Sequence, residues 1–176
     1  MIGCIIQARI GSDRLPEKIL KKLDEKNTIL DYVINQTSKS EKLEKIVIAT
    51  TNLNEDDVIE KFCKDRNIYC FRGSENDVLD RHYQCAKKYS IDPIVRITSD
   101  NPVIDPEIID LAIEKYEKGE FDMVTTCNQR SFPYGISVEV FSYDALEKSW
   151  NSSKLPSERE HVVLFMQNKK NNFRIY

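Results

Sequence analysis

The sequence predicts an α/β fold in which a mainly parallel β-sheet is covered by helices on both faces. Short segments rich in Ile, Val and Thr alternate along the chain with amphipathic segments of helical length, as in β-α-β units. Several of the short segments are apolar at successive positions, which strands covered on both faces require. The chain has 176 residues, 40% of them hydrophobic, which is enough for one domain with its own core.

The short apolar segments are expected to be strands, because β-branched residues fit a pleated and buried surface. They are residues 2–8, 46–51, 69–72, 94–98, 123–126 and 136–141. The helices expected between and after them are residues 29–38, 56–67, 78–89, 107–118, 144–150 and 158–168. In the second of these helices, Val58, Ile59, Phe62 and Cys63 share one apolar stripe.

Helix starts are predicted from residues whose side chains accept hydrogen bonds from the free N–H groups of a first helical turn. The expected N-caps are Asn54, Ser74, Asp105, Ser142 and Ser157, and Pro106 suits a first helical position. Ser74 with Asp77, and Ser157 with Glu160, have the spacing of a capping box.

The charge distribution favours a small anionic ligand. The formal net charge is −3, although residues 1–22 contain five Lys or Arg against two Asp or Glu. A local basic site on an acidic body argues against a nucleic-acid-binding protein, whose basic surface is normally broad. The five cysteines form no CxxC pair, and no apolar run reaches membrane length. A cytoplasmic protein without membrane-spanning segments is therefore expected.

The basic site is the segment QARIGSDRLPEK, residues 7–18, which directly follows the first expected strand. It matches neither a Walker A loop nor a GxGxxG fingerprint. Gly11 and Ser12 can turn backbone N–H groups inward, while Arg9, Arg14 and Lys18 can neutralise several charges. In open α/β sheets ligands bind beyond the carboxyl ends of the strands. The segment is therefore predicted to bind a polyphosphate; the alternative is a solvated basic loop.

A second informative segment is IVRITSDNPVIDP, residues 94–106, where an apolar strand runs directly into Asp100. A carboxylate there suits Mg²⁺, which proteins hold through one or two carboxylates together with substrate phosphates. The alternative is that Asp100 is a turn residue, and Asp105 is interpreted as a helix cap. A phosphate loop and a metal-binding aspartate at two strand ends together indicate metal-assisted phosphoryl or nucleotidyl transfer.

The string from Arg9 to Lys18, RIGSDRLPEK, resembles the R-x-x-S-x-R-L-P-x-K signature of the CMP-Kdo synthetase and acylneuraminate cytidylyltransferase family. The segments RGSENDVLDRHYQCAKKY and VRITSDNPVIDP are similar to its spore-coat polysaccharide branch. The resemblance implies a nucleotide-diphosphosugar transferase (GT-A, Rossmann-like) fold, and transfer of CMP from CTP to an acidic sugar with release of pyrophosphate. It further implies a homodimer.

The resemblance also implies roles for individual residues. Arg9, Ser12, Arg14 and Lys18 would hold the CTP phosphates, Asp100 would carry Mg²⁺, and Ala8 and Gly11 would complete the nucleotide loop. Of these, Arg9, Arg14 and Lys18 would serve catalysis by neutralising charge. Sugar-site candidates are Glu139 and His161, and the alternative for His161 is an ordinary surface or packed residue.

The segment FRGSENDVLDR aligns with the family pattern T-R-x-D-H-x-S-G-T-[DE]-R, so Arg72, Asp80 and Arg81 match nucleotide-site positions. The S-G-T part of the pattern is replaced by Asp77, Val78 and Leu79. An alternative for Arg81 is an ion pair with Asp80 or Asp77 on the same helix.

Two other functions stay open at this point. A GT-A glycosyltransferase would be expected to show a D-x-D metal motif, which the chain lacks. A nucleotide-binding fragment without turnover is the second alternative, because the final FRIY resembles the beginning of a strand. Residues 1–176 are accordingly interpreted as a single cytidylyltransferase-like domain without its C-terminal part. The second metal-binding aspartate is expected past Tyr176, with Asp105, Glu139 and Glu160 as the other candidates.

Overall fold

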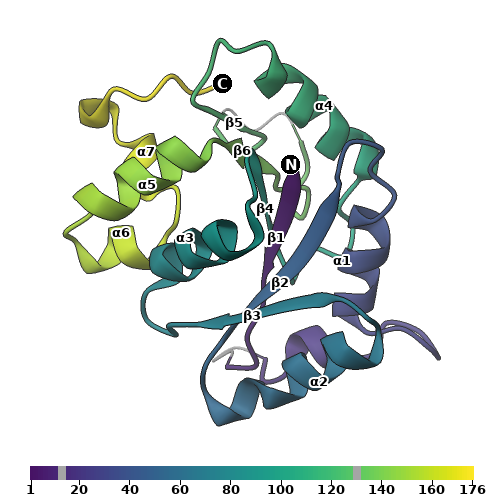
Figure 1. Ribbon diagram of the computed structural model, residues 1–176. Helices are drawn as coiled ribbons and strands as arrows, with labels where there is room; N and C mark the ends of the chain where they lie inside the picture. Colours follow the sequence, from purple (N-terminus) through teal and green to yellow (C-terminus); the bar gives the residue numbers. More distant parts are fainter. Residues whose placement is uncertain (12–14, 129–131) are drawn as a thin grey trace.

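The computed structural model describes residues 1–11, 15–128 and 132–176. Its centre is a six-stranded sheet with the strand order β3-β2-β1-β4-β6-β5 (Figure 1). The strands are β1 Gly3–Gln7, β2 Lys45–Thr51, β3 Tyr69–Gly73, β4 Ile94–Thr98, β5 Met123–Thr125 and β6 Glu139–Phe141. The first four pair in parallel, and β6 runs antiparallel between β4 and β5. The prediction of a mainly parallel sheet is confirmed.

Helices cover both faces of the sheet, as predicted (Figure 1). One face carries α1 Ile29–Thr37, α2 Asp57–Asp65 and α4 Pro106–Glu117, packed on Cys4, Ile6 and Ile97. The other carries α3 Val78–Tyr89, α5 Tyr143–Ser152, α6 Pro156–Glu160 and α7 Leu164–Gln167, packed on strand residues such as Ile5 and Phe141. Successive residues of β1 thus enter different cores, which explains its unbroken apolar sequence.

Two of the predicted N-caps are confirmed and three are wrong. The side chains of Asp105 and Ser142 accept hydrogen bonds from Glu107 N and Ala145 N, both at 2.9 Å. The cap of α3 is Asp77 in place of Ser74, whose hydroxyl instead accepts a hydrogen bond from Asp77 N. Asn54 opens a 3-10 turn, Asn54–Asp56, ahead of α2, and the predicted cap Ser157 lies inside α6.

The prediction of one helix over residues 158–168 is wrong, because the helix is interrupted at His161. Helix α6 begins at Pro156, where the Glu158 carboxylate accepts hydrogen bonds from Lys154 N at 3.2 Å and Leu155 N at 3.3 Å. His161 has an extended backbone, and α7 begins only at Leu164. After the break, Val162 and Val163 are buried in the core beneath α3 and α5.

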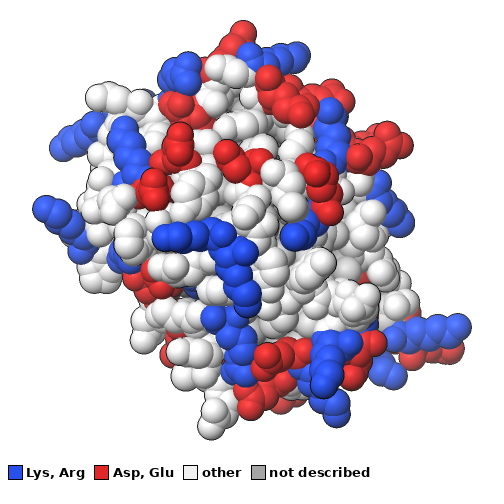
Figure 2. All heavy atoms as spheres, in the orientation of Figure 1, with Lys and Arg blue, Asp and Glu red and all other residues white. Residues whose placement is uncertain are grey.

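The last residues of the chain pair with the edge of the sheet. Ile175 forms a parallel bridge with Met123 of β5, as the strand-like sequence FRIY predicts. Two 3-10 turns, Lys18–Leu20 and Lys169–Asn171, complete the secondary structure of the described residues, in which no helix is long and apolar enough to span a bilayer. Basic and acidic side chains are intermixed on the face shown in Figure 2, apart from a run of Lys and Arg across α3 and β3.

Candidate active site

A cavity of about 620 Å³ lies at the carboxyl ends of β1 and β4. Its walls are the segment after β1, the turn after β4, the β3–α3 connection and α6. Seven predicted site residues line it, namely Ala8, Arg9, Gly11, Lys18, Arg81, Asp100 and His161. Ser12 and Arg14, which belong to the same loop, lie outside the described residues. Residues widely separated in the sequence therefore meet at one edge of the sheet, where parallel strands place ligands.

The start of the basic loop is held by a buried carboxylate that the sequence analysis did not identify. Asp56 is fully buried and accepts a hydrogen bond from Ile10 N at 2.7 Å and another from the Thr51 hydroxyl. The backbone of Ala8 is fixed from the same side, because Ala8 N donates to Ala49 O at 3.0 Å. In the sequence Asp56 is only the first residue of the helix expected over 56–67, because its contact with the loop depends on β1 and β2 being neighbours.

Lys18 and Asp100 form an ion pair across the cavity, with 2.5 Å between Lys18 Nζ and Asp100 Oδ2. Burial raises the pKa of the Asp100 carboxyl, but hydrogen bonds from Lys18 and Thr98 lower it by more, so it lies below the ordinary aspartate range. Asp100 is therefore ionised at neutral pH, and the stability that this pair contributes is lost only as the pH falls through that low pKa.

Asp100 can supply one ligand to a metal ion. Its side chain is 41% exposed, so a cation could reach it from the cavity. Among the described residues, no group of three or more His, Cys, Asp or Glu could hold a metal. A single carboxylate fits Mg²⁺ only where phosphate oxygens and water complete the coordination.

Arg81 is a buried cation that faces another cation. Only 2% of its surface is exposed, its Nη1 donates to Ser74 O at 2.8 Å, and its Nε has no hydrogen-bond partner in the described part of the chain. Burial, and then the nearby charge of Arg9, lower the pKa of Arg81 to about 10. The predicted alternative of an ion pair with Asp77 or Asp80 is not found. An anion bound between Arg9 and Arg81 would relieve both effects.

A buried polar network forms the floor of the cavity. Arg96 of β4 donates to Gln7 Oε1 through Nε at 3.1 Å and Nη2 at 2.8 Å, and its Nη1 donates to Glu139 of β6. Arg96 and Gln7 line the cavity, whereas Glu139 does not. Gln7 and Arg96 were missed in the sequence, where only the polar interruption of two apolar strands marks them.

Of the three residues matched to the family's nucleotide-site pattern, Arg81 lines the cavity and Arg72 and Asp80 do not. Arg72 donates to Asp57 Oδ1 at 2.5 Å and Glu60 Oε2 at 2.8 Å, and also to backbone carbonyls. Asp80 accepts a hydrogen bond from Trp150 Nε1 at 2.8 Å. Both side chains therefore bind neighbouring elements of the fold. His161 is exposed at the rim of the cavity.

The matched family settles the general class of the protein. A family model described as cytidylyltransferase matches residues 3–176. The chain belongs to the cytidylyltransferase family. Its fold is the fold of this family: a cytidylyltransferase from Leptospira borgpetersenii is 39% identical and superposes with a TM-score of 0.92, covering 99% of this chain and 74% of that one.

Two further relatives align with almost the whole chain. An uncharacterized protein of Methanocaldococcus jannaschii is 45% identical over 98% of this chain and 69% of its own length. The spore coat polysaccharide biosynthesis protein SpsF of Bacillus subtilis is 35% identical over 97% of this chain and 72% of its own length. The resemblance to the spore-coat branch, first seen in short motifs, thus extends over almost the whole chain.

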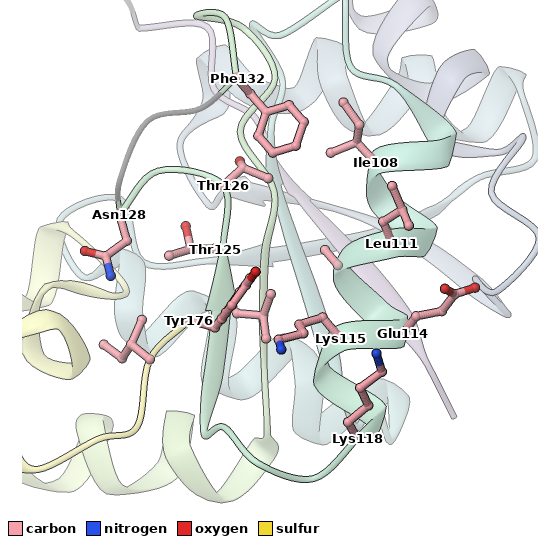
Figure 3. A pocket seen from close by; sticks show the side chains of 13 residues that line it. Ile108, Leu111, Glu114, Lys115, Lys118, Thr125, Thr126, Asn128, Phe132 and Tyr176 are labelled. Carbon is pink, nitrogen blue, oxygen red and sulfur yellow. The ribbon is translucent and has the colours of Figure 1, made fainter.

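The cytidylyltransferase fold carries a second cavity of about 720 Å³, between α4 and β5. In Figure 3, Ile108 and Leu111 of α4 lie opposite Phe132 and Tyr176, and Lys115 and Lys118 lie at one end. None of the predicted site residues lines it. The two cavities share no lining residue.

Proposed function

We propose that the protein is a CTP-dependent sugar cytidylyltransferase that transfers CMP from CTP to an acidic sugar and releases pyrophosphate. The observation that carries this proposal is the convergence of Arg9, Lys18, Arg81 and Asp100 on one cavity at the carboxyl edge of the sheet. Three cations and one carboxylate suit a nucleoside triphosphate and its metal ion. The acidic sugar follows from the resemblance to the CMP-Kdo synthetases, and a role in surface polysaccharide synthesis follows from the similarity to SpsF.

In this reaction a sugar hydroxyl attacks the α-phosphorus of CTP, an O–P bond forms, and the bond to pyrophosphate breaks. Arg9 and Lys18 would neutralise the charge that develops on the leaving pyrophosphate, together with Arg14 of the same loop. Arg81 would bind CTP from the α3 side of the cavity. The chain contributes mainly positioning and charge neutralisation, because phosphoryl chemistry of this kind needs little covalent participation by the protein.

Asp100 would hold Mg²⁺, which when bound would neutralise phosphate charge. In the free protein the Lys18 ammonium group is paired with Asp100 Oδ2. Phosphate oxygens of CTP offer Lys18 a new partner and at the same time complete a metal coordination shell around Asp100. Nucleotide and metal are therefore expected to bind together.

Asp100→Asn is expected to abolish the Mg²⁺ dependence of CTP binding with little loss of stability. The amide keeps the size of the side chain but removes the charge that attracts a cation. The ion pair with Lys18 is partly exposed, so its loss should lower the free energy of unfolding by no more than about 1 kcal/mol. Calorimetric titrations of CTP with and without MgCl₂ measure the effect. A variant that unfolds easily yet keeps the Mg²⁺ effect would assign Asp100 to the turn alone.

The activity itself is tested by pyrophosphate release. The purified chain is incubated with CTP, MgCl₂ and a panel of acidic sugars that includes 3-deoxy-manno-octulosonate, and UTP, ATP and GTP serve as nucleotide controls. The proposal expects release with CTP and at least one acidic sugar. Tight CTP binding without release on any sugar would favour a nucleotide-binding role instead.

We further propose that the protein is a cytoplasmic homodimer whose subunits meet over the face of α4. This face exposes the large apolar side chains of Leu111, Phe132 and Tyr176. An apolar surface of this kind favours association with another chain. The cytoplasmic assignment agrees with five cysteines that are all free thiols.

Leu111→Asp is expected to convert the dimer to a monomer. The side chain is 59% exposed, so the substitution leaves the core intact but places a charge in an apolar contact. Light scattering coupled to gel filtration measures the mass. Val58→Asp is the matched control, because Val58 is 44% exposed on α2, which lies at the opposite end of the same helical layer from α4 (Figure 1). Equal masses for the Leu111 variant and the parent chain would rule out this interface.

A further inference from the structure

Gln7 is an oriented amide at the floor of the cavity. It is the last residue of β1, directly before the basic loop. Both Nε and Nη2 of Arg96 donate to its oxygen, so the amide orientation is fixed: only the oxygen can accept from a guanidinium. Its Nε2 has no partner among the residues that the structure describes and is not among their buried unpartnered atoms. Since Gln7 lines the cavity, this NH₂ group is available to a ligand.

Arg96 itself offers less to a ligand than its charge suggests. Its three guanidinium nitrogens donate to Gln7 and Glu139, and the Glu139 carboxylate, in a side chain only 9% exposed, compensates the charge. Arg96 and Glu139 thus form a neutral pair that fixes the direction of Gln7. Arg96 is a positioning residue, and Gln7 is the group that a substrate would meet.

A fixed N–H donor recognises an acceptor, and the pyrimidine bases differ there. The O2 atom is an acceptor in both bases. Cytosine N3 is also an acceptor, whereas uracil carries a hydrogen on N3 that would oppose the donor. In the segment that aligns with the family pattern, Arg72 and Asp80 are bound by neighbouring helices, whereas Arg81 lines the cavity. Gln7 offers a neutral donor at the same cavity.

We propose that Gln7 donates a hydrogen bond to N3 of cytosine and gives the site its preference for CTP over UTP. Arg96 and Glu139 hold the amide in the orientation that makes it a donor. The inference rests on the proposed function, because it assumes that the cavity binds CTP.

The test is Gln7→Glu, which keeps oxygen acceptors for Arg96 but replaces the free NH₂ group by a second oxygen. A structural role of Gln7, as acceptor for Arg96, would survive this substitution; a donor role would not. We expect the ratio of CTP to UTP affinity, measured by calorimetry with MgCl₂, to fall at least about tenfold, the size of one lost hydrogen bond. The added negative charge opposes both nucleotides equally, so it cancels in the ratio.

Asn76→Asp is the matched control, since it adds the same charge from an exposed amide that borders the same cavity. It should weaken the binding of both nucleotides and leave the ratio of CTP to UTP affinity unchanged. An unchanged ratio in the Gln7 variant, or an equal change in both variants, overturns the inference. A parent protein that binds CTP no better than UTP would instead refute the CTP dependence of the proposed function, so the two failures are distinguishable.

Discussion

Arg96→Met is expected to lower the free energy of unfolding by about 3–5 kcal/mol, because it leaves the buried Glu139 carboxylate without its counter-charge. The side chains of Arg96 and Glu139 are only 15% and 9% exposed, so water can compensate little of the loss. Methionine retains most of the aliphatic stem, and the effect therefore reports charge more than volume. Chemical denaturation followed by circular dichroism gives the free energy.

The control for this experiment removes both charges together. In Arg96→Met combined with Glu139→Met, no buried charge remains unpaired, so most of the lost stability should return. A double variant as unstable as the single one would show that packing around Arg96 determines the effect. A single variant with parental stability would mean that solvent reaches Glu139 after all.

Lys18→Met is expected to weaken CTP binding by about 1.5–3 kcal/mol, the scale of a charge-assisted hydrogen bond to phosphate. The unfolding temperature of the free protein should barely change, because the ion pair with Asp100 is partly exposed. Calorimetric titration with CTP in MgCl₂ measures the affinity.

Lys21→Met provides the comparison for Lys18, since Lys21 is an exposed lysine of the same short segment and does not line the cavity. It removes the same charge from the loop region and should change the affinity by no more than a few tenths of a kcal/mol. Similar losses in both variants would assign the effect to overall charge and would contradict a direct contact between Lys18 and phosphate.

The strands could be predicted well because strand propensity and burial are both encoded in short, continuous stretches of the sequence. A run such as IVIATT in β2 carries its strand propensity and its burial in the same residues, and the alternation with helices then implies parallel pairing. The break at His161 could not be predicted in this way. It depends on how Val162 and Val163 reach the core beneath α3, which is a contact between distant segments.

The candidate site also contains residues that the local sequence reveals and residues that depend on contacts between distant segments. The charged residues of the basic loop and Asp100 were visible because they follow apolar strands directly. The network of Gln7, Arg96 and Glu139 was not, because it requires β1, β4 and β6 to be neighbours although β6 comes last in the chain. Arg72 shows the converse, since a residue that matched the family pattern pairs with Asp57 and Glu60 of α2.

Arg81 illustrates how a binding site can oppose the stability of its own fold. The protein holds a buried guanidinium beside Arg9 with one nitrogen unpartnered among the described residues, and burial and the Arg9 charge outweigh the attraction of Asp56 and Glu75. This arrangement disfavours the folded state until an anion arrives. Selection or redesign for stability alone would replace this arginine by an apolar residue of similar length. The resulting protein should withstand heat better than its parent and respond less to nucleotide, so thermal tolerance and ligand response would move in opposite directions at this one position.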